Sequence, residues 1–306
     1  MTHYAIPDRL NLLIAGAVVI TASALAGLAS QLSLLWSIPL GILFSFVLLT
    51  NYALIHEAAH DMLHSRARIN WFVGMLLSWF FPSSFTVLKT AHIVHHRCNR
   101  TDHEMFDGYY AGDIRSLKFV QWYGIMLGLW WPLIPLGNLI LALIPGLLGT
   151  PPFRKARCTS IVFDDFDQAT LWKVRLEVAL AIVFWVSLYH LLDLRWQTLA
   201  VFYAFFAFNW STRQYVTHAF TPRDVRDGAL NLKVSRPLSW ILLQGQWDLV
   251  HHQHPHASWI HLQKLAAFSK PPISYWRQYL KLWKGPRLYT EPGPAILPKQ
   301  DYLVMD

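Results

Sequence analysis

The sequence predicts an all-α, polytopic membrane protein with four transmembrane helices, further interfacial helices and a cytoplasmic helical cap that holds a dimetal site. Three observations support this fold class. The 306 residues are 54% hydrophobic and only 14% charged, which is too little polar surface for a soluble domain of this size. Residues 10–55 contain no Asp, Glu, Lys or Arg. Eight histidines stand in short groups beside apolar segments of membrane length.

Residues 10–30 and 34–55 form the first two predicted spans, because each approaches the roughly 20 residues that cross a bilayer. Gln31 and Ser33 mark the polar turn between them. No small-residue cleavage pattern precedes a polar mature region, so we expect a retained span instead of a removed signal peptide.

Two further spans are predicted at residues 171–192 and 196–217, joined by a short polar turn. Residues 71–88 and 119–150 are also uncharged, but prolines interrupt both, so we expect interfacial or re-entrant segments. Residues 221–306 form a tail of mixed polarity without a span. No repeat or linker divides the chain, and residues 1–306 are predicted to form a single domain.

The orientation follows from parity and from charge. If all histidine groups serve one site, they lie on one side of the membrane, and the two spans between residues 96 and 218 satisfy that requirement. Basic residues gather in the loops on this side, and Lys and Arg favour cytoplasmic loops, so the histidines are expected to be cytoplasmic. These basic residues are Arg66, Arg68, Lys89, Arg97, Arg100, Arg115, Lys118, Arg154, Lys155 and Arg157. They are dispersed among apolar segments, which argues against nucleic acid as a partner.

The histidines recur at helical spacing. Residues three or four apart share one face of a helix, so each group is expected to direct its imidazoles to one point. Burying this many imidazoles is costly unless a metal binds them. The predicted metal ligands are His56, His60, His92, His95, His96, His218, His251, His252 and Asp248.

The number of histidines favours a dinuclear site. Eight imidazoles exceed the four ligands of one zinc ion and suit two iron ions that keep positions open for oxygen. Glu57, Asp61 and Asp102 are candidates for carboxylates that orient histidines from outside, and each also fits a solvated charge at a helix end.

Four other histidines and the cysteines stand apart from this set. His64, His254 and His256 are left open as ligands. His190, at the far end of its predicted span, is expected to have no metal role. Cys98 and Cys158 are too few for a disulfide framework, and Cys98 is too isolated to count as a ligand.

Residues 56–60 also spell H-E-x-x-H, the motif in which two histidines bind zinc and the glutamate is the general base of a metallopeptidase. That reading gives no role to the later histidine groups. A metal transporter is the other alternative, although transport sites usually lie within the spans and use few ligands.

In this order the groups resemble the membrane fatty acid desaturase and hydroxylase superfamily, with its H-x(3,4)-H, H-x(2,3)-H-H and (H/Q)-x-x-H-H boxes. His56/His60, His92/His95/His96 and His251/His252 match the boxes. His218 matches an extra histidine of the stearoyl-type enzymes, and Gln214 stands where those enzymes have Asn. Asp248 departs from the pattern, since it replaces the first residue of the last box.

The resemblance implies two non-haem Fe ions, O2 as co-substrate and electrons from an external donor. No His-Pro-Gly-Gly haem motif is present, so a separate ferredoxin, rubredoxin or cytochrome b5-type donor with its reductase is implied. The substrate is expected to be an apolar lipid, such as an acyl chain or a carotenoid. Desaturation, hydroxylation and ketolation all remain open at this point, as do the regioselectivity and the oligomeric state.

Overall fold

The computed structural model describes residues 4–155, 161–164 and 166–302; Arg157 and Cys158, named above, lie outside these ranges. The described chain is mostly helical, as predicted. Its elements are α1 (Asp8–Gln31), η1 (Leu34–Trp36), α2 (Ser37–Ala59), α3 (Ala67–Phe80), α4 (Phe85–Cys98), β1 (Gly108–Tyr109), α5 (Arg115–Met126), α6 (Leu133–Leu143), η2 (Pro145–Gly149), α7 (Pro151–Lys155), α9 (Gln168–Leu191), α10 (Trp196–Gln214), β2 (Leu232–Lys233), α11 (Arg236–Ile241), α12 (Asp248–Gln253), α13 (Trp259–Leu265), η3 (Ala266–Phe268), β3 (Ile273–Ser274), α14 (Tyr275–Leu282), β4 (Arg287–Leu288) and α15 (Lys299–Tyr302).

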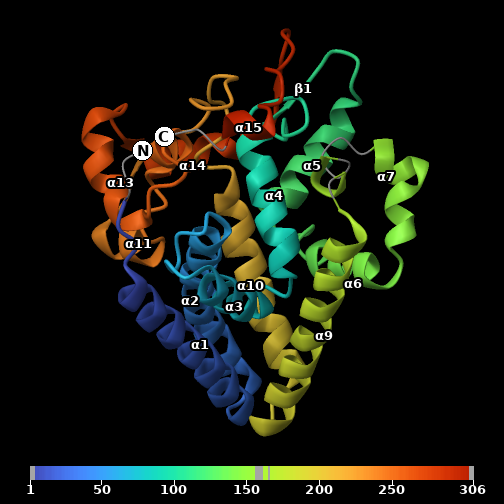
Figure 1. Ribbon diagram of the computed structural model, residues 1–306, viewed down its shortest axis with the longest axis vertical. Helices are drawn as coiled ribbons and strands as arrows, with labels where there is room; N and C mark the ends of the chain where they lie inside the picture. Colours follow the sequence, from blue (N-terminus) through green and yellow to red (C-terminus); the bar gives the residue numbers. More distant parts are fainter. Residues whose placement is uncertain (1–3, 156–160, 165, 303–306) are drawn as a thin grey trace.

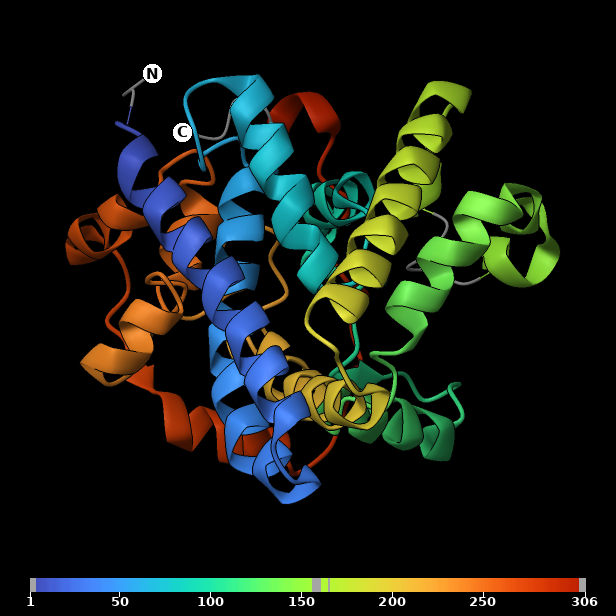
Figure 2. The same cartoon turned by 90° about the horizontal axis from the view of Figure 1, so that it is seen from below.

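The long helices form two antiparallel hairpins whose turns meet at one end of the molecule, the narrow lower end in Figure 1. Arg195 in the α9–α10 turn donates hydrogen bonds to the carbonyls of Ala29 and Leu32, beside the α1–α2 turn. Seen from below, α3 lies between α1 and α9 (Figure 2). Both chain ends and the short helices of the cap gather at the opposite, wider end.

Three described helices, α1, α2 together with η1, and α9, are long and apolar enough to cross a membrane. The count rises to four if the bent pair α3 and α4 makes one further span. The fourth predicted span corresponds to α10, which is not among them, since Asn209, Arg213 and Gln214 make its last turns polar. Several outward residues of α9 are large and apolar, as lipid contact requires. The chain is therefore an integral membrane protein.

The end of α2 places its two histidines at the cap. The backbone amide of Met62 donates to the carbonyl of Glu57, and that of Asp61 donates to the carbonyl of Ala58. Asp61 has a φ of 60°, the left-handed conformation that ends many helices in this way. The helix therefore stops directly after His56 and His60 have been set on one face.

A sharp break separates α3 from α4 and directs α4 toward the cap. The two helices meet at 97°, and Pro82 lies in the break, where its missing N–H interrupts the helical hydrogen bonds. Ser84 caps α4 by accepting from the amide of Val87. The buried carboxylate of Glu177 on α9 accepts hydrogen bonds from Ser84 and from Thr86, so α9 holds the start of α4 in place.

The predicted tail of residues 221–306 folds into the cap. It contains α11 to α15, and two pairs of two-residue parallel strands join it internally and to the segment after α4. Trp259 of α13 is buried, and its indole N–H donates to Asn11 of α1, which attaches the cap to the first helix.

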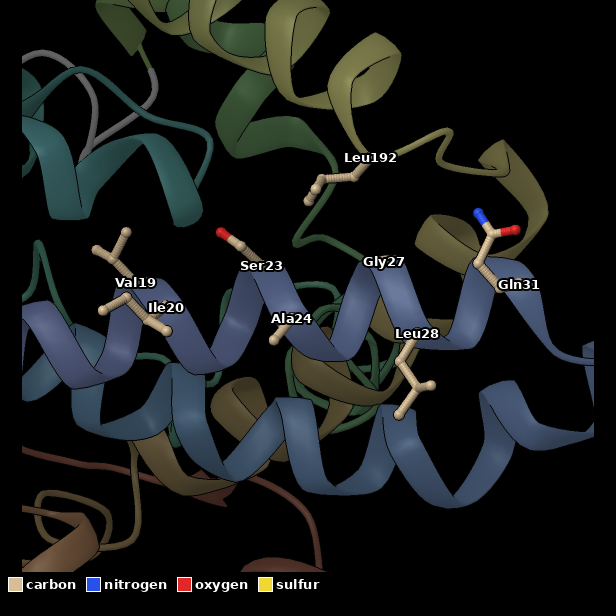
Figure 3. Close-up of a pocket in the computed structure, with 8 residues that line it drawn as sticks. All are labelled: Val19, Ile20, Ser23, Ala24, Gly27, Leu28, Gln31 and Leu192. Carbon is tan, nitrogen blue, oxygen red and sulfur yellow. The ribbon is translucent and has the colours of Figure 1, made fainter.

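A groove of about 610 Å³ lies along α1, lined by Val19, Ile20, Ser23, Ala24, Gly27, Leu28, Gln31 and Leu192 (Figure 3). Gln31 and Leu192 place it at the turn end of the hairpins, the end opposite to His56 and His60. Its lining is almost entirely apolar, as expected for a surface that lipid covers.

Candidate metal centre

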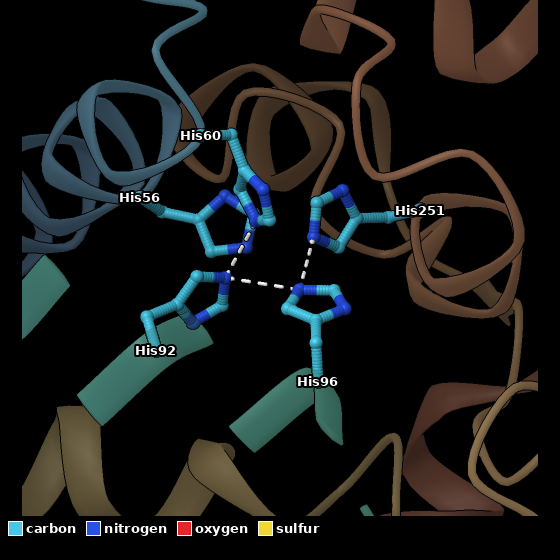
Figure 4. Close-up of side chains that lie close together, drawn as sticks. All are labelled: His56, His60, His92, His96 and His251. Atoms are coloured by element: carbon cyan, nitrogen blue, oxygen red, sulfur yellow. Dashed lines mark hydrogen bonds between the residues drawn. The ribbon is translucent and has the colours of Figure 1, made fainter. Parts of the chain in front are cut away.

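Five histidines from three segments converge where α2, α4 and α12 meet (Figure 4). Each offers a ring nitrogen, and these nitrogens all lie within 4.8 Å of one another. Three of the five residues are buried and the other two are half-buried. This five-histidine group consists of His56, His60, His92, His96 and His251.

A second group contains His95, His218 and His252, whose ring nitrogens also lie within 4.8 Å of one another. His218 lies four residues beyond the end of α10, in a turn that faces α12. The two groups adjoin, because the ring centroids of His96 and His252 are 4.3 Å apart. The eight predicted histidines therefore form two neighbouring groups, an arrangement that suits two metal ions.

The histidine boxes divide between the two groups, which was not predicted. The second box was expected to aim all three imidazoles at one point, but His92 and His96 face the five-histidine group while His95 faces the other. His251 and His252 divide in the same way. Successive residues on a helix point about 100° apart, so neighbours face different groups while residues four apart stay together.

The spacing of the ring nitrogens fits a shared ion. The Nε2 atom of His92 lies 2.7 Å from that of His60 and 3.1 Å from that of His96, and the Nε2 atoms of His96 and His251 are 3.0 Å apart. Two ligands bound about 2.1 Å from one ion lie about 3.0 Å apart at a right angle and about 3.4 Å apart at the tetrahedral angle. Ring nitrogens at these separations can therefore reach one shared ion.

Asp248 lies beside the second group, next to His218. Its Oδ2 atom lies 3.0 Å from Nε2 of His218, yet this buried oxygen has no hydrogen-bond partner in the described chain. Burial alone would raise the pKa of Asp248, but the adjacent His218 favours the ionised carboxylate and holds the pKa well below its usual value. The group is thus an ionised carboxylate beside His218.

The histidines of α12 are neutral at pH 7, as metal binding requires. Burial lowers the pKa of His251 and of His252 well below the ordinary value, and neighbouring imidazoles lower both further. Asp248 opposes this effect without reversing it. Neutral imidazoles keep a lone pair for a metal ion.

The three carboxylates named as candidates for orienting histidines have the following contacts. Asp61 contacts Lys89 with 2.6 Å between Oδ2 and Nζ, and Asp102 binds Arg223. Glu57 accepts hydrogen bonds from the hydroxyl of Ser258 and the amide of Trp259, and its other oxygen is 4.0 Å from Nδ1 of His56.

The Gln214 side chain contacts Tyr52 of α2. His64, His254, His256 and Cys98 belong to neither of the two groups found in the described chain. His64 instead accepts a hydrogen bond from the backbone amide of Arg66.

His190 lies in the last turn of α9, at the end of the molecule opposite to the two groups (Figure 1). Its side chain is exposed. That it has no metal role stays a prediction.

Two residues at the site were not found from the sequence. Oε2 of Glu104 lies 2.6 Å from Nδ1 of His95, and the hydroxyl of Tyr302 lies 3.1 Å from Nδ1 of His60. Glu104 follows its histidine by nine residues and Tyr302 follows its own by 242, so neither has a local spacing that could reveal it.

The sequence model of the fatty acid desaturase family matches residues 33–284, a range that contains all eight histidines of the two groups and Asp248. A search of curated proteins found no match to the chain.

Proposed function

The chain belongs to the fatty acid desaturase family, and on that premise we propose that it desaturates a fatty acyl chain or a similar lipid in an O2-dependent reaction. The match supports the coarser statement that it is an oxidoreductase of the desaturase and hydroxylase type. The observation that carries the finer proposal is the pair of adjoining groups, which together offer eight imidazoles, with the Asp248 carboxylate beside His218.

The residues fit two non-haem irons. His56, His60, His92, His96 and His251 would hold one iron, and His95, His218, His252 and Asp248 the other. The chemistry that such irons supply when bound is activation of O2 and removal of hydrogen from an unactivated C–H bond. The chain contributes by holding the ligands rigidly on the ends of packed helices and by excluding water from the reacting atoms.

Hydrogen bonds behind the ligands support this assignment. A metal-binding histidine usually donates its outer N–H to a carboxylate or carbonyl, which fixes the tautomer. Glu104 is placed to accept from His95, and the carbonyl of Gly228 lies 3.4 Å from Nδ1 of His218. Both histidines then present Nε2 to the ion.

We also propose that the site faces the cytoplasm and receives electrons from a ferredoxin, rubredoxin or cytochrome b5-type donor with its reductase. Exposed cations on the cap, among them Arg226, Lys264 and Lys270, support contact with an acidic donor. The excess of basic residues in the loops at this end supports the cytoplasmic orientation.

A hydroxylase or ketolase of a lipid or carotenoid is the second candidate, because it uses the same ligand set. A zinc metallopeptidase is disfavoured by Glu57, whose carboxylate is engaged with Ser258 and Trp259 and is therefore not free to activate a water molecule. The family match and the two groups also leave a metal transporter without support.

The test begins with metal content, measured by mass spectrometry and Mössbauer spectroscopy on detergent-purified protein grown with ample iron. We expect about two non-haem irons per chain. Lipids from cells that express the wild type should contain a product that is absent with His95→Ala, while the matched control His190→Ala should keep iron and product near wild type. One zinc and no iron, even after anaerobic reconstitution, would contradict the proposal.

A further inference from the structure

The last described part of the chain, residues 285–302, lies outside the family match and folds back over the cap; we call it the C-terminal strap. It contains four prolines, which restrict its backbone and stiffen it. In Figure 1 its final helix, α15, lies beside the cap end of α4.

Backbone contacts fix the strap along its length to the segment that follows α4. The amide of Tyr289 donates to the carbonyl of Tyr109, and the amide of Gly293 donates to the carboxylate of Asp102. Further on, the Leu297 amide donates to the carbonyl of Arg97, whose guanidinium returns a hydrogen bond to the Leu297 carbonyl. These contacts fix the position of the end of the strap.

The end of the strap lies against the five-histidine group. Tyr302 is buried, with 2% of its surface exposed, and its hydroxyl lies 3.1 Å from Nδ1 of His60. Its ring also packs against the ring of His96, at 5.7 Å between centroids. A buried tyrosine hydroxyl costs free energy unless it is hydrogen-bonded, so this contact accounts for the position of the side chain.

We propose that the C-terminal strap belongs to the metal centre. Tyr302 is its positioning residue, because it fixes the tautomer of His60 and closes the five-histidine group. The inference rests on the proposed function in one respect: it takes a metal ion to occupy the five-histidine group.

The geometry of His60 carries the proposal. Its Nε2 faces the other imidazoles, 2.7 Å from Nε2 of His92, while Nδ1 faces Tyr302. If the Tyr302 oxygen accepts a hydrogen bond from Nδ1–H, the lone pair of His60 is left on Nε2, where the metal would bind.

The hydrogen bond between Tyr302 and His60 is important because two other imidazoles of the five-histidine group lack one at their outer nitrogen. The buried Nδ1 atoms of His96 and His251 have no hydrogen-bond partner in the described chain. Tyr302 thus gives the five-histidine group the kind of outer hydrogen bond that Glu104 gives to His95 in the other group.

The test compares full-length wild type with Tyr302→Phe, which keeps the ring and removes only the hydroxyl. The matched control is Tyr123→Phe. The Tyr123 hydroxyl donates to the carbonyl of Trp283, and no histidine is among its hydrogen-bond partners in the described chain. Each protein is loaded anaerobically with Fe²⁺, and metal loss is followed against a chelator, with Mössbauer spectra of the loaded forms.

We expect Tyr302→Phe to lose one of its irons about 10–100-fold more readily and to change one of two quadrupole doublets, while Tyr123→Phe matches the wild type. A truncation after Pro298 should show the same loss, which keeps the test decisive if Tyr302→Phe folds poorly. Equal retention of both irons in all forms, with unchanged spectra, would overturn the role of Tyr302. Absence of iron from the wild type would instead contradict the proposed function.

Discussion

Replacing Asp248 with Ala is the sharpest test of how the proposed second metal ion would be held. Asp248 is the one carboxylate among the nine proposed ligands, and its Oδ2 lies 3.0 Å from Nε2 of His218 without a hydrogen bond. This separation equals that of two ligands about 2.1 Å from one ion at a right angle. The variant leaves that ion with only His95, His218 and His252.

The expected magnitude follows from the number of ligands. Loss of a group that only orients a ligand already costs 10–100-fold in metal affinity, so loss of one of four ligands should cost about 100-fold or more, or about 2.7 kcal/mol. The affinity of the five-histidine group should stay near wild type, because Asp248 is not part of it.

The assay is iron titration of the purified protein against a chelator of known affinity, with product formation measured in parallel. We expect about one tightly held iron per chain in Asp248→Ala and no product. Asp248→His, which restores the residue type of the family's last box, should keep both irons.

Asp61→Asn is the control, because it removes the carboxylate that contacts Lys89 while Asn tolerates the left-handed backbone at this position. It should bind iron as the wild type does. If Asp248→Ala retains two tightly bound irons and full activity, Asp248 is not a ligand and the reasoning from spacing is wrong.

Three further predictions concern groups around the site. Glu104→Gln should weaken iron binding about 10-fold by chelator titration, since a neutral amide orients His95 less strongly; unchanged affinity would refute this. Glu177→Leu should lower the free energy of unfolding by about 3 kcal/mol in thermal denaturation, because buried donors at the start of α4 lose their acceptor, whereas Glu177→Gln should lose less. Burial opposes ionisation of Asp102, but the hydrogen bonds that it accepts, including that from Arg223, lower its pKa. The strap should therefore stay attached to the Asp102 carboxylate above about pH 4 and show faster hydrogen exchange below it. Asp102→Asn should remove this pH dependence.

Local patterns in the sequence were sufficient for the membrane helices and for most of the candidate site. Charge-free runs predict α1 and α2 because a bilayer admits only such segments as spans. The three histidine boxes predict the family, and the match over residues 33–284 confirms it. α10 shows the limit of this reasoning, because its packing against α2 accommodates polar residues that a lipid-exposed span would not carry.

Sequence spacing by itself determined which histidines share a helix face, since helical periodicity is a local property of the chain. Only the tertiary structure decided how those faces divide between two groups, because that depends on the angles at which α2, α4 and α12 meet. It also decided that Glu104, and not Asp102, supports a histidine, and that Tyr302 returns across 242 residues to His60. Such contacts depend on packing between distant segments, which no short spacing in the chain encodes.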